Sequence, residues 1–228
     1  MSDARLIQVN LWPCGKTAWD EAGRLGGRTD LPLGRAGEAE ASALVSGLTR
    51  GEFGVVVCGP DAASRHTAEL VRKVTGAKIK VLESLAEVDV GLWEGSHRDQ
   101  LRARCPSACR DLTQDPDAVV APNGESWRAA TERLTTALAG ELGRQAGRKV
   151  AVVLRPLAHA ILSRWLHELA GTKVAEVHDA LDGSPAPARF TLERSRFAAG
   201  GVGVVGGVMG GVGSVVLGAV MWGTGTRV

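Results

Sequence analysis

The sequence predicts an α/β protein of three layers, in which helices cover both faces of a mostly parallel sheet. Short runs rich in β-branched residues, at 53–58 and 149–154, are typical of buried parallel strands. Each run is followed by a longer stretch with helical spacing of its apolar residues. Strands that alternate with helices of ten or more residues imply right-handed crossover connections, and these build a parallel sheet.

The expected elements follow one another in this alternating order along the first 193 residues. Strands are predicted at 5–12, 53–58, 78–82, 149–154 and, as an edge strand, 187–193. Helices are predicted at 34–48, 62–74, 124–144 and 157–169. In such a sheet the functional site lies beyond the carboxyl ends of the strands. We therefore expect the loops after Leu11, Cys58 and Leu154 to form it.

Length, charge and cysteine content narrow the class of protein. A chain of 228 residues is long enough for one domain with a full core. Its 27 basic and 25 acidic residues give a net charge of +2, which predicts no nucleic-acid partner. The four cysteines form no disulfide framework, and Cys105 and Cys109 lack a second pair of metal ligands. We expect no metal, no cofactor and, because no signal peptide is visible, a cytoplasmic domain.

The composition changes near residue 196, which predicts a domain at 1–196 and a hydrophobic Gly-rich tail at 197–228. Residues 197–226 contain no charge and eleven glycines. The 23 residues from Gly200 to Trp222 are enough to span a membrane, for which about 20 are needed. Glycines spaced four apart also allow close packing of helices. A membrane anchor, self-association or docking to a protein partner, and a flexible tail remain open.

Three segments carry specific motifs, and their order is informative. They are LWPCGKTAWDEAGRLGGRTDLPL at 11–33, LAEVDVGLWEG at 85–95 and PNGESW at 122–127. Together they resemble the histidine phosphatase (phosphoglycerate mutase-like) superfamily over about residues 5–193. The resemblance implies the phosphoglycerate mutase-like version of the predicted fold.

The resemblance also implies a set of catalytic positions, most of which are substituted here. The family uses a histidine nucleophile, two arginines and a second histidine around the phosphoryl group, and an acid for the leaving group. Pro13 and Cys14 stand at the positions of the first arginine and the nucleophile. Ala63 stands at the second arginine and Arg155 at the second histidine, whereas the acid is retained as Glu87.

These substitutions predict a pseudoenzyme. Removal of one charge-stabilising donor typically lowers a rate by about 10²–10³, and without the nucleophile the covalent route is lost. The sequence therefore predicts a non-catalytic binding or scaffold module that is tethered or oligomerised by its tail. Two alternatives remain: a phosphatase-like enzyme of altered mechanism using Cys14 with Glu87 as acid, or an anion sensor using Lys16, Arg24 and Arg155. An Arg155–Glu87 ion pair is favoured over a bound anion.

The histidines lie outside the catalytic positions that the resemblance implies. We expect each to be at the surface or to be a structural histidine with its hydrogen bonds satisfied. They are His66, His97, His159, His167 and His178.

Overall fold

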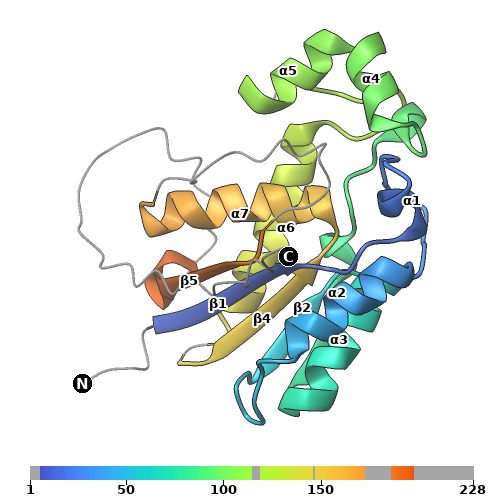
Figure 1. Cartoon of the computed structure of the whole chain (residues 1–228). Helices are drawn as coiled ribbons and strands as arrows, with labels where there is room; N and C mark the ends of the chain where they lie inside the picture. The colour runs from blue at the N-terminus through green and yellow to red at the C-terminus, as the bar shows by residue number, and fades with distance from the viewer. Residues whose placement is uncertain (1–5, 115–118, 146, 173–185, 198–228) are drawn as a thin grey trace, which may run out of the picture.

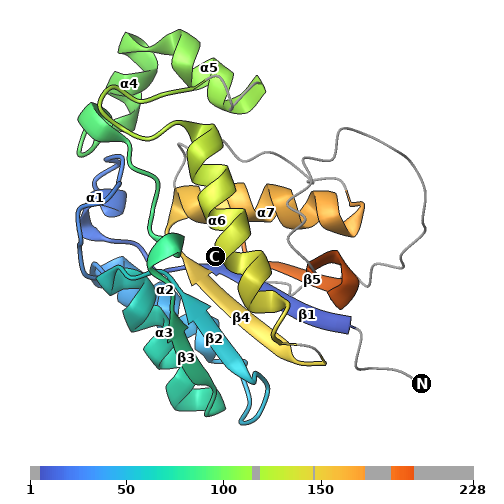
Figure 2. The same ribbon diagram turned by 180° about the vertical axis from the view of Figure 1, so that it is seen from behind.

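The computed structural model describes residues 6–114, 119–145, 147–172 and 186–197, and it confirms the predicted fold class. Five strands form one sheet in the order β3-β2-β4-β1-β5. The four strands β1 to β4 run parallel, and β5 is antiparallel to β1. Figures 1 and 2 show the sheet between two layers of helices.

The observed elements agree with every predicted strand and helix to within a few residues. The strands are β1 (Leu6–Pro13), β2 (Val55–Cys58), β3 (Lys78–Val81), β4 (Lys149–Leu154) and β5 (Ala188–Glu193). The helices are α1 (Ala18–Glu21), α2 (Arg35–Val45), α3 (Ala62–Thr75), α4 (Arg98–Arg104), α5 (Pro106–Gln114), α6 (Trp127–Leu142) and α7 (Pro156–Ala170). Of these, α1, α4 and α5 were not expected from the sequence. All three are short, at four, seven and nine residues.

Local signals in the sequence account for the ends of the long helices. The Asp61 side chain accepts a hydrogen bond from the Ser64 N–H and caps α3, and Gly76 ends that helix in the left-handed conformation at φ 76°. Ser126 caps α6 in the same way. Helix α7 begins with Pro156, whose fixed φ and missing N–H suit the first helical position.

Two hydrophobic cores lie on the two faces of the sheet. Side chains alternate along a strand, so in β2 Val55 and Val57 face one core, while Val56 and Cys58 face the other. The first core is completed by α6 and α7 and the second by α2 and α3, as the two views show. Burial on both faces explains why β2 and β4 are apolar at nearly every position.

The short helices lie beyond the carboxyl ends of the strands, where the site was predicted. Figure 1 shows α1 and the pair α4–α5 at this end of the molecule. The segment after α1 is tied to the segment before α4 by backbone hydrogen bonds, from Leu25 N–H to Ser96 O at 2.8 Å and from Arg98 N–H to Gly23 O at 3.0 Å. These two stretches, with helices α1, α4 and α5, form a layer over this edge of the sheet, which we call the cap.

The loop after β1 packs against the start of α2 so closely that two positions require glycine. A Cβ atom added to Gly37 would lie 1.9 Å from the backbone oxygen of Lys16, and one added to Gly15 would lie 2.2 Å from the oxygen of Gly37. We expect Gly37→Ala to lower the free energy of unfolding by about 2–3 kcal/mol, measured by urea denaturation. Gly47→Ala is the control, since nothing lies within 4 Å of that position. Equal stability of the two variants would contradict the prediction.

The hydrophobic tail, apart from Phe197, lies outside the described residues. The predictions of a membrane anchor, of self-association and of a domain boundary at residue 196 therefore stay predictions. None of the helices in the described part of the chain is long and apolar enough to cross a membrane.

Candidate active site

The end of β1 places Cys14 inside the second core. The Cys14 N–H donates to the oxygen of Leu154 at 2.7 Å, so the ends of β1 and β4 lie side by side. The next amide, that of Gly15, donates to the Thr67 hydroxyl of α3 at 3.2 Å. Cys14 is only 7 % exposed and packs with the apolar side chains of this core. Pro13, half-buried, ends the strand opposite Leu154.

Arg155 follows β4 and is the largest fully buried side chain, with 2 % exposure. Its NH2 atom lies 3.7 Å from Asp20 Oδ2. The guanidinium also lies against Gly26, where an added Cβ would be 2.2 Å from NH2. Within the described residues the side chain makes this ion pair but no hydrogen bond, and its Nε atom is buried without a partner. Burial lowers the pKa of Arg155, but the nearby charges, those of Asp20 and Glu87 among them, outweigh burial and raise it.

Glu87 reaches the same region from the segment after β3, and its carboxylate caps α7. Oε1 accepts hydrogen bonds from the Val88 and Ala158 N–H groups at 2.8 and 2.7 Å, and Oε2 accepts one from Leu157 at 2.9 Å. Two of these donors belong to the first turn of α7, where N–H groups have no partner within the helix. Burial raises the pKa of Glu87 to about 7, although the Arg155 charge and the three N–H groups oppose this rise.

The expected Arg155–Glu87 ion pair is therefore replaced by another arrangement. Arg155 pairs with Asp20, and Glu87 acts on Arg155 through its charge while its oxygens bind backbone N–H groups. The physical reason is that the first turn of α7 offers Glu87 two otherwise unpaired donors.

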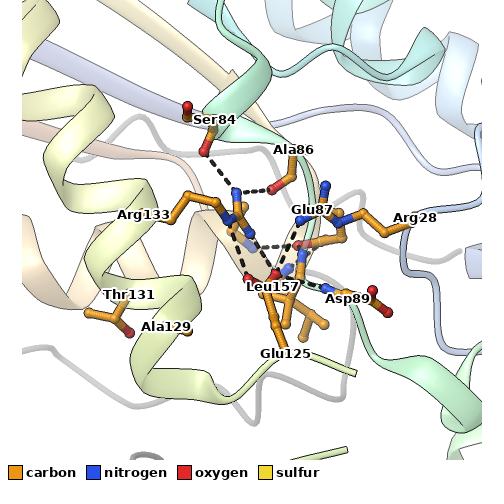
Figure 3. A network of polar contacts seen from close by, with 12 residues as sticks. Arg28, Ser84, Ala86, Glu87, Asp89, Glu125, Ala129, Thr131, Arg133 and Leu157 are labelled. Carbon is orange, nitrogen blue, oxygen red and sulfur yellow. Dashed lines mark hydrogen bonds and ion pairs between the residues drawn. The ribbon is translucent and has the colours of Figure 1, made fainter. Parts of the chain in front are cut away.

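A polar network holds the segment that carries Glu87 (Figure 3). From α6, Arg133 NH1 donates to the backbone oxygens of Ser84 and Ala86 at 2.8 and 3.0 Å. Its NH2 atom binds Glu125 Oε1 at 2.6 Å, and the same oxygen accepts the Asp89 N–H at 2.9 Å. These contacts fix the backbone on both sides of Glu87, so the acid has one position relative to α7.

Asp20 connects the site to the cap. Its Oδ2 atom accepts hydrogen bonds from the N–H and the hydroxyl of Thr17 at 2.9 and 2.6 Å. The Asp20 N–H donates in return to the Thr17 hydroxyl oxygen at 3.4 Å, which completes a capping box at the start of α1. Its Oδ1 atom accepts one from Arg98 NH2 of α4 at 3.2 Å. The sequence reasoning missed both Asp20 and Arg98. The Thr-x-x-Asp spacing was a signal for the capping box, but nothing in the sequence placed Arg98 here.

The loop after β2 contributes a carboxylate rather than the family's arginine. Ala63 is fully buried in the apolar core, so no charge occupies its position. Asp61 uses Oδ1 for the α3 cap, whereas Oδ2 is buried and has no hydrogen-bond partner among the described residues. Asp61 lies near enough to Cys14 to act on its pKa. Asp61 is a third site residue that the sequence reasoning missed, after Asp20 and Arg98.

Two cations of the predicted anion site have other partners. Lys16 Nζ lies 2.9 Å from Glu40 Oε1 of α2. Arg24 NH1 donates to the backbone oxygen of Gly95 at 2.7 Å and holds the cap. Anion binding by the set Lys16, Arg24 and Arg155 stays a prediction. Of the three, Arg155 has a buried donor, Nε, without a partner among the described residues.

The cysteine environment predicts a protected thiol. Burial raises the pKa of Cys14 well above its ordinary value, and Asp61 adds to the rise more than Arg155 opposes it. We expect iodoacetamide to modify the half-buried Cys105 and Cys109 at least about 100-fold faster than Cys14 at pH 8, followed by peptide mass spectrometry. Unfolded protein, in which all cysteines react alike, is the control. Reaction of native Cys14 as fast as Cys105 would show an accessible thiolate.

His159, one turn after Arg155 on α7, differs from the expectation for the histidines. It is 1 % exposed, and neither ring nitrogen makes a hydrogen bond of normal geometry within the described residues, although the Leu11 backbone lies close enough to interact. Burial lowers its pKa to about 4, so the ring is neutral at physiological pH. His159 is therefore structural but not satisfied.

The order of the strands and the helices on both faces of the sheet define a phosphoglycerate mutase-like α/β fold. The sequence model of the histidine phosphatase superfamily (branch 1) matches residues 14–180. The chain therefore belongs to the histidine phosphatase superfamily. It is 30 % identical over 159 residues to "Probable phosphoglycerate mutase GpmB" of Klebsiella pneumoniae, a match that covers 67 % of this chain and 71 % of that protein.

Solved structures share the fold at lower identity. Phosphoglycerate mutase from Bacillus anthracis has a TM-score of 0.68 at 20 % identity, covering 84 % of this chain and 90 % of that one. A mycobacterial glucosyl-3-phosphoglycerate phosphatase has a TM-score of 0.65 at 24 % identity, covering 82 % and 91 %. The α-ribazole phosphatase from Shigella flexneri has a TM-score of 0.60 at 23 % identity, covering 75 % and 83 %.

These relatives contradict the prediction of a non-catalytic scaffold and of a chain that is not an enzyme. The GpmB relative carries the name of a mutase, and so points to catalysis. The prediction was wrong in equating the loss of one route with the loss of all catalysis. Enzymes that lack their nucleophile can keep rates about 10³–10⁴ above the uncatalysed reaction, because binding and charge stabilisation remain.

Proposed function

We propose that this chain is a phosphomonoester hydrolase in which Arg155 binds the phosphoryl group and Glu87 protonates the leaving oxygen. The family and the names of its relatives support the class of reaction. The observation that carries the proposal is the Arg155 guanidinium, buried at the carboxyl edge of the sheet without a hydrogen bond among the described residues. Phosphoryl oxygens are the acceptors that a guanidinium fork fits best.

A water molecule is the nucleophile in this proposal, because the raised pKa of Cys14 keeps its side chain a thiol, whereas the thiolate is the nucleophilic form. The water oxygen bonds to phosphorus while the bond from phosphorus to the leaving oxygen breaks. Glu87 gives its proton to that oxygen. One proton of the water stays on the phosphate product, and the other returns to Glu87. Phosphoryl transfer needs little help beyond positioning and charge stabilisation, so a site without a nucleophilic side chain suffices for slow turnover.

The protonation state of Glu87 suits this role. A general acid works best when its pKa lies near the operating pH, and burial raises the pKa of Glu87 to about 7. The acid form is the active one, so turnover falls as the pH rises above this value.

The test is hydrolysis of p-nitrophenyl phosphate and 3-phosphoglycerate by the full chain, followed as released phosphate from pH 5 to 9. We expect slow turnover that declines above about pH 7 and is abolished in Glu87→Gln. Cys14→Ser is expected to keep the activity, because the thiol is not the nucleophile. If Cys14→Ser loses the activity, Cys14 and not water is the nucleophile. If hydrolysis of both substrates is indistinguishable from that in buffer, the proposal is overturned.

A further inference from the structure

The edge of the sheet at β3 is a surface that the proposed reaction does not use. In the described residues β3 pairs with β2 alone, and Figure 2 shows it at the margin of the sheet beside α3. The Lys78 N–H donates to Gly54 O and the Leu82 N–H to Cys58 O, so every second residue directs its peptide groups toward β2. The intervening residues, Ile79 and Val81, direct theirs away from the sheet. Such a row of unpaired groups is a template for another strand.

The side chains of Ile79 and Val81 form one wall of a groove of about 500 Å³ between β3 and α3. Helix α3 supplies the other wall with Arg65, Arg72 and Lys73, and with a single carboxylate, that of Glu69. Alternate residues of β3 face the other side of the sheet, where Lys80 pairs with the buried Glu141 of α6. The exposed strand edge and the groove therefore lie side by side on the α3 face.

The charges that line this groove favour a negatively charged ligand. Arg72 Nε lies 2.7 Å from Glu69 Oε2, which neutralises one of the three cations. Arg65 and Lys73 have no ion pair in the described part of the chain, and both are exposed. We propose that an acidic peptide binds here in extended form, as an added strand along β3 with alternate acidic side chains over the groove.

A second copy of this chain fits the edge less well. Pairing two β3 strands would bring Arg65 and Lys73 of one copy toward the same cations of the other, and like charges across a strand pair are destabilising. An acidic strand instead satisfies the outward peptide groups and the two cations together. This binding is independent of phosphomonoester hydrolysis, since the groove lies away from Cys14, Glu87 and Arg155.

The binding test uses fluorescence anisotropy with a labelled (Glu-Thr)₄ peptide and, for comparison, (Lys-Thr)₄. Ile79→Pro removes an outward N–H but leaves the β2 ladder intact. Lys73→Glu reverses a groove charge, and Lys78→Glu is the matched control, with the same charge change on the opposite face of β3. We expect the full chain to bind the acidic peptide alone. Binding should weaken at least tenfold in Ile79→Pro and Lys73→Glu, and less than threefold in Lys78→Glu.

Several results would overturn this inference. The first is that the full chain does not bind the acidic peptide at concentrations up to 1 mM. The second is that Lys78→Glu weakens binding as much as Lys73→Glu does. The third is that Ile79→Pro and Lys73→Glu both bind the peptide as tightly as the wild type. Analytical sedimentation of the protein without peptide gives one more such result. If the protein is a dimer, and if Ile79→Pro dissociates it, the β3 edge binds a second copy of the chain and not a peptide. Circular dichroism checks that each variant is folded, and Lys73→Glu, an exposed substitution, tests the groove even if Ile79→Pro unfolds.

Discussion

Replacing Arg155 by alanine is expected to lower kcat/KM for phosphomonoester hydrolysis by about 10²–10³-fold. In the proposed reaction this guanidinium is the cation at the end of β4 that meets the phosphoryl oxygens. The structure buries it 3.7 Å from Asp20, and its Nε has no partner among the described residues, so this donor is in place for a phosphoryl oxygen. Charge stabilisation by such preorganised donors is usually the largest single contribution to catalysis. The measurement is initial rates with p-nitrophenyl phosphate.

Two further variants separate binding from folding. Arg155→Lys keeps the charge that balances Asp20 and Glu87 but loses the planar fork, so we expect an intermediate rate. Arg164→Ala removes an exposed arginine of the same helix, paired with Glu168, and should leave the rate unchanged. Because removal of one buried charge can destabilise the fold, urea denaturation accompanies each assay. Arg155→Ala that is folded and as active as the wild type would contradict the proposed role.

The fold could be predicted because its main signals are local. The β2 and β4 runs are apolar on both faces, and the helices that follow them carry caps such as Asp61 and Gly76. The parallel order follows from the alternation of the elements. Helices α4 and α5 could not be predicted in this way. Short cap helices depend on contacts such as the Leu25–Ser96 hydrogen bond, which join parts of the sequence that no local pattern connects.

The sequence predicted the edge of the sheet at which the candidate site lies, but not which residue pairs with Arg155 there. Cys14, Glu87 and Arg155 lie close enough that the charges of Arg155 and Glu87 shift the pKa of Cys14, as the carboxyl edge of a parallel sheet implies. The partner of Arg155 could not be predicted, because Asp20 and Arg98 reach the site through the fold of the cap. The expectation of no catalysis failed for a different reason. It rested on substituted positions, whereas activity also depends on the charges and acids that stay in place.

Substitution of Glu87 and of His159, both of them buried, is expected to reveal opposite dependences of stability on pH. Glu87 has a pKa of about 7 in the folded protein and about 4.5 when unfolded, so the folded state holds more protons between these values. Its contribution to stability therefore decreases as the pH rises from 4.5 to 7. His159 has a folded pKa of about 4 and an unfolded value of 6.5, so the folded state holds fewer protons. Its contribution increases as the pH rises from 4 to 6.5.

Each group contributes about 3 kcal/mol across its window, and the two contributions nearly cancel in the wild type. In His159→Leu only the contribution of Glu87 remains of these two. The free energy of unfolding should then fall by about 1 kcal/mol per pH unit between pH 5 and 6.5. In Glu87→Gln the free energy of unfolding should instead rise with pH by a similar amount over the same range. Urea denaturation at three pH values measures the slopes. The half-buried His167, whose pKa burial also lowers, is present in every variant and so does not affect the difference between slopes. If both variants kept the wild-type slope, neither group would have the pKa that its burial implies.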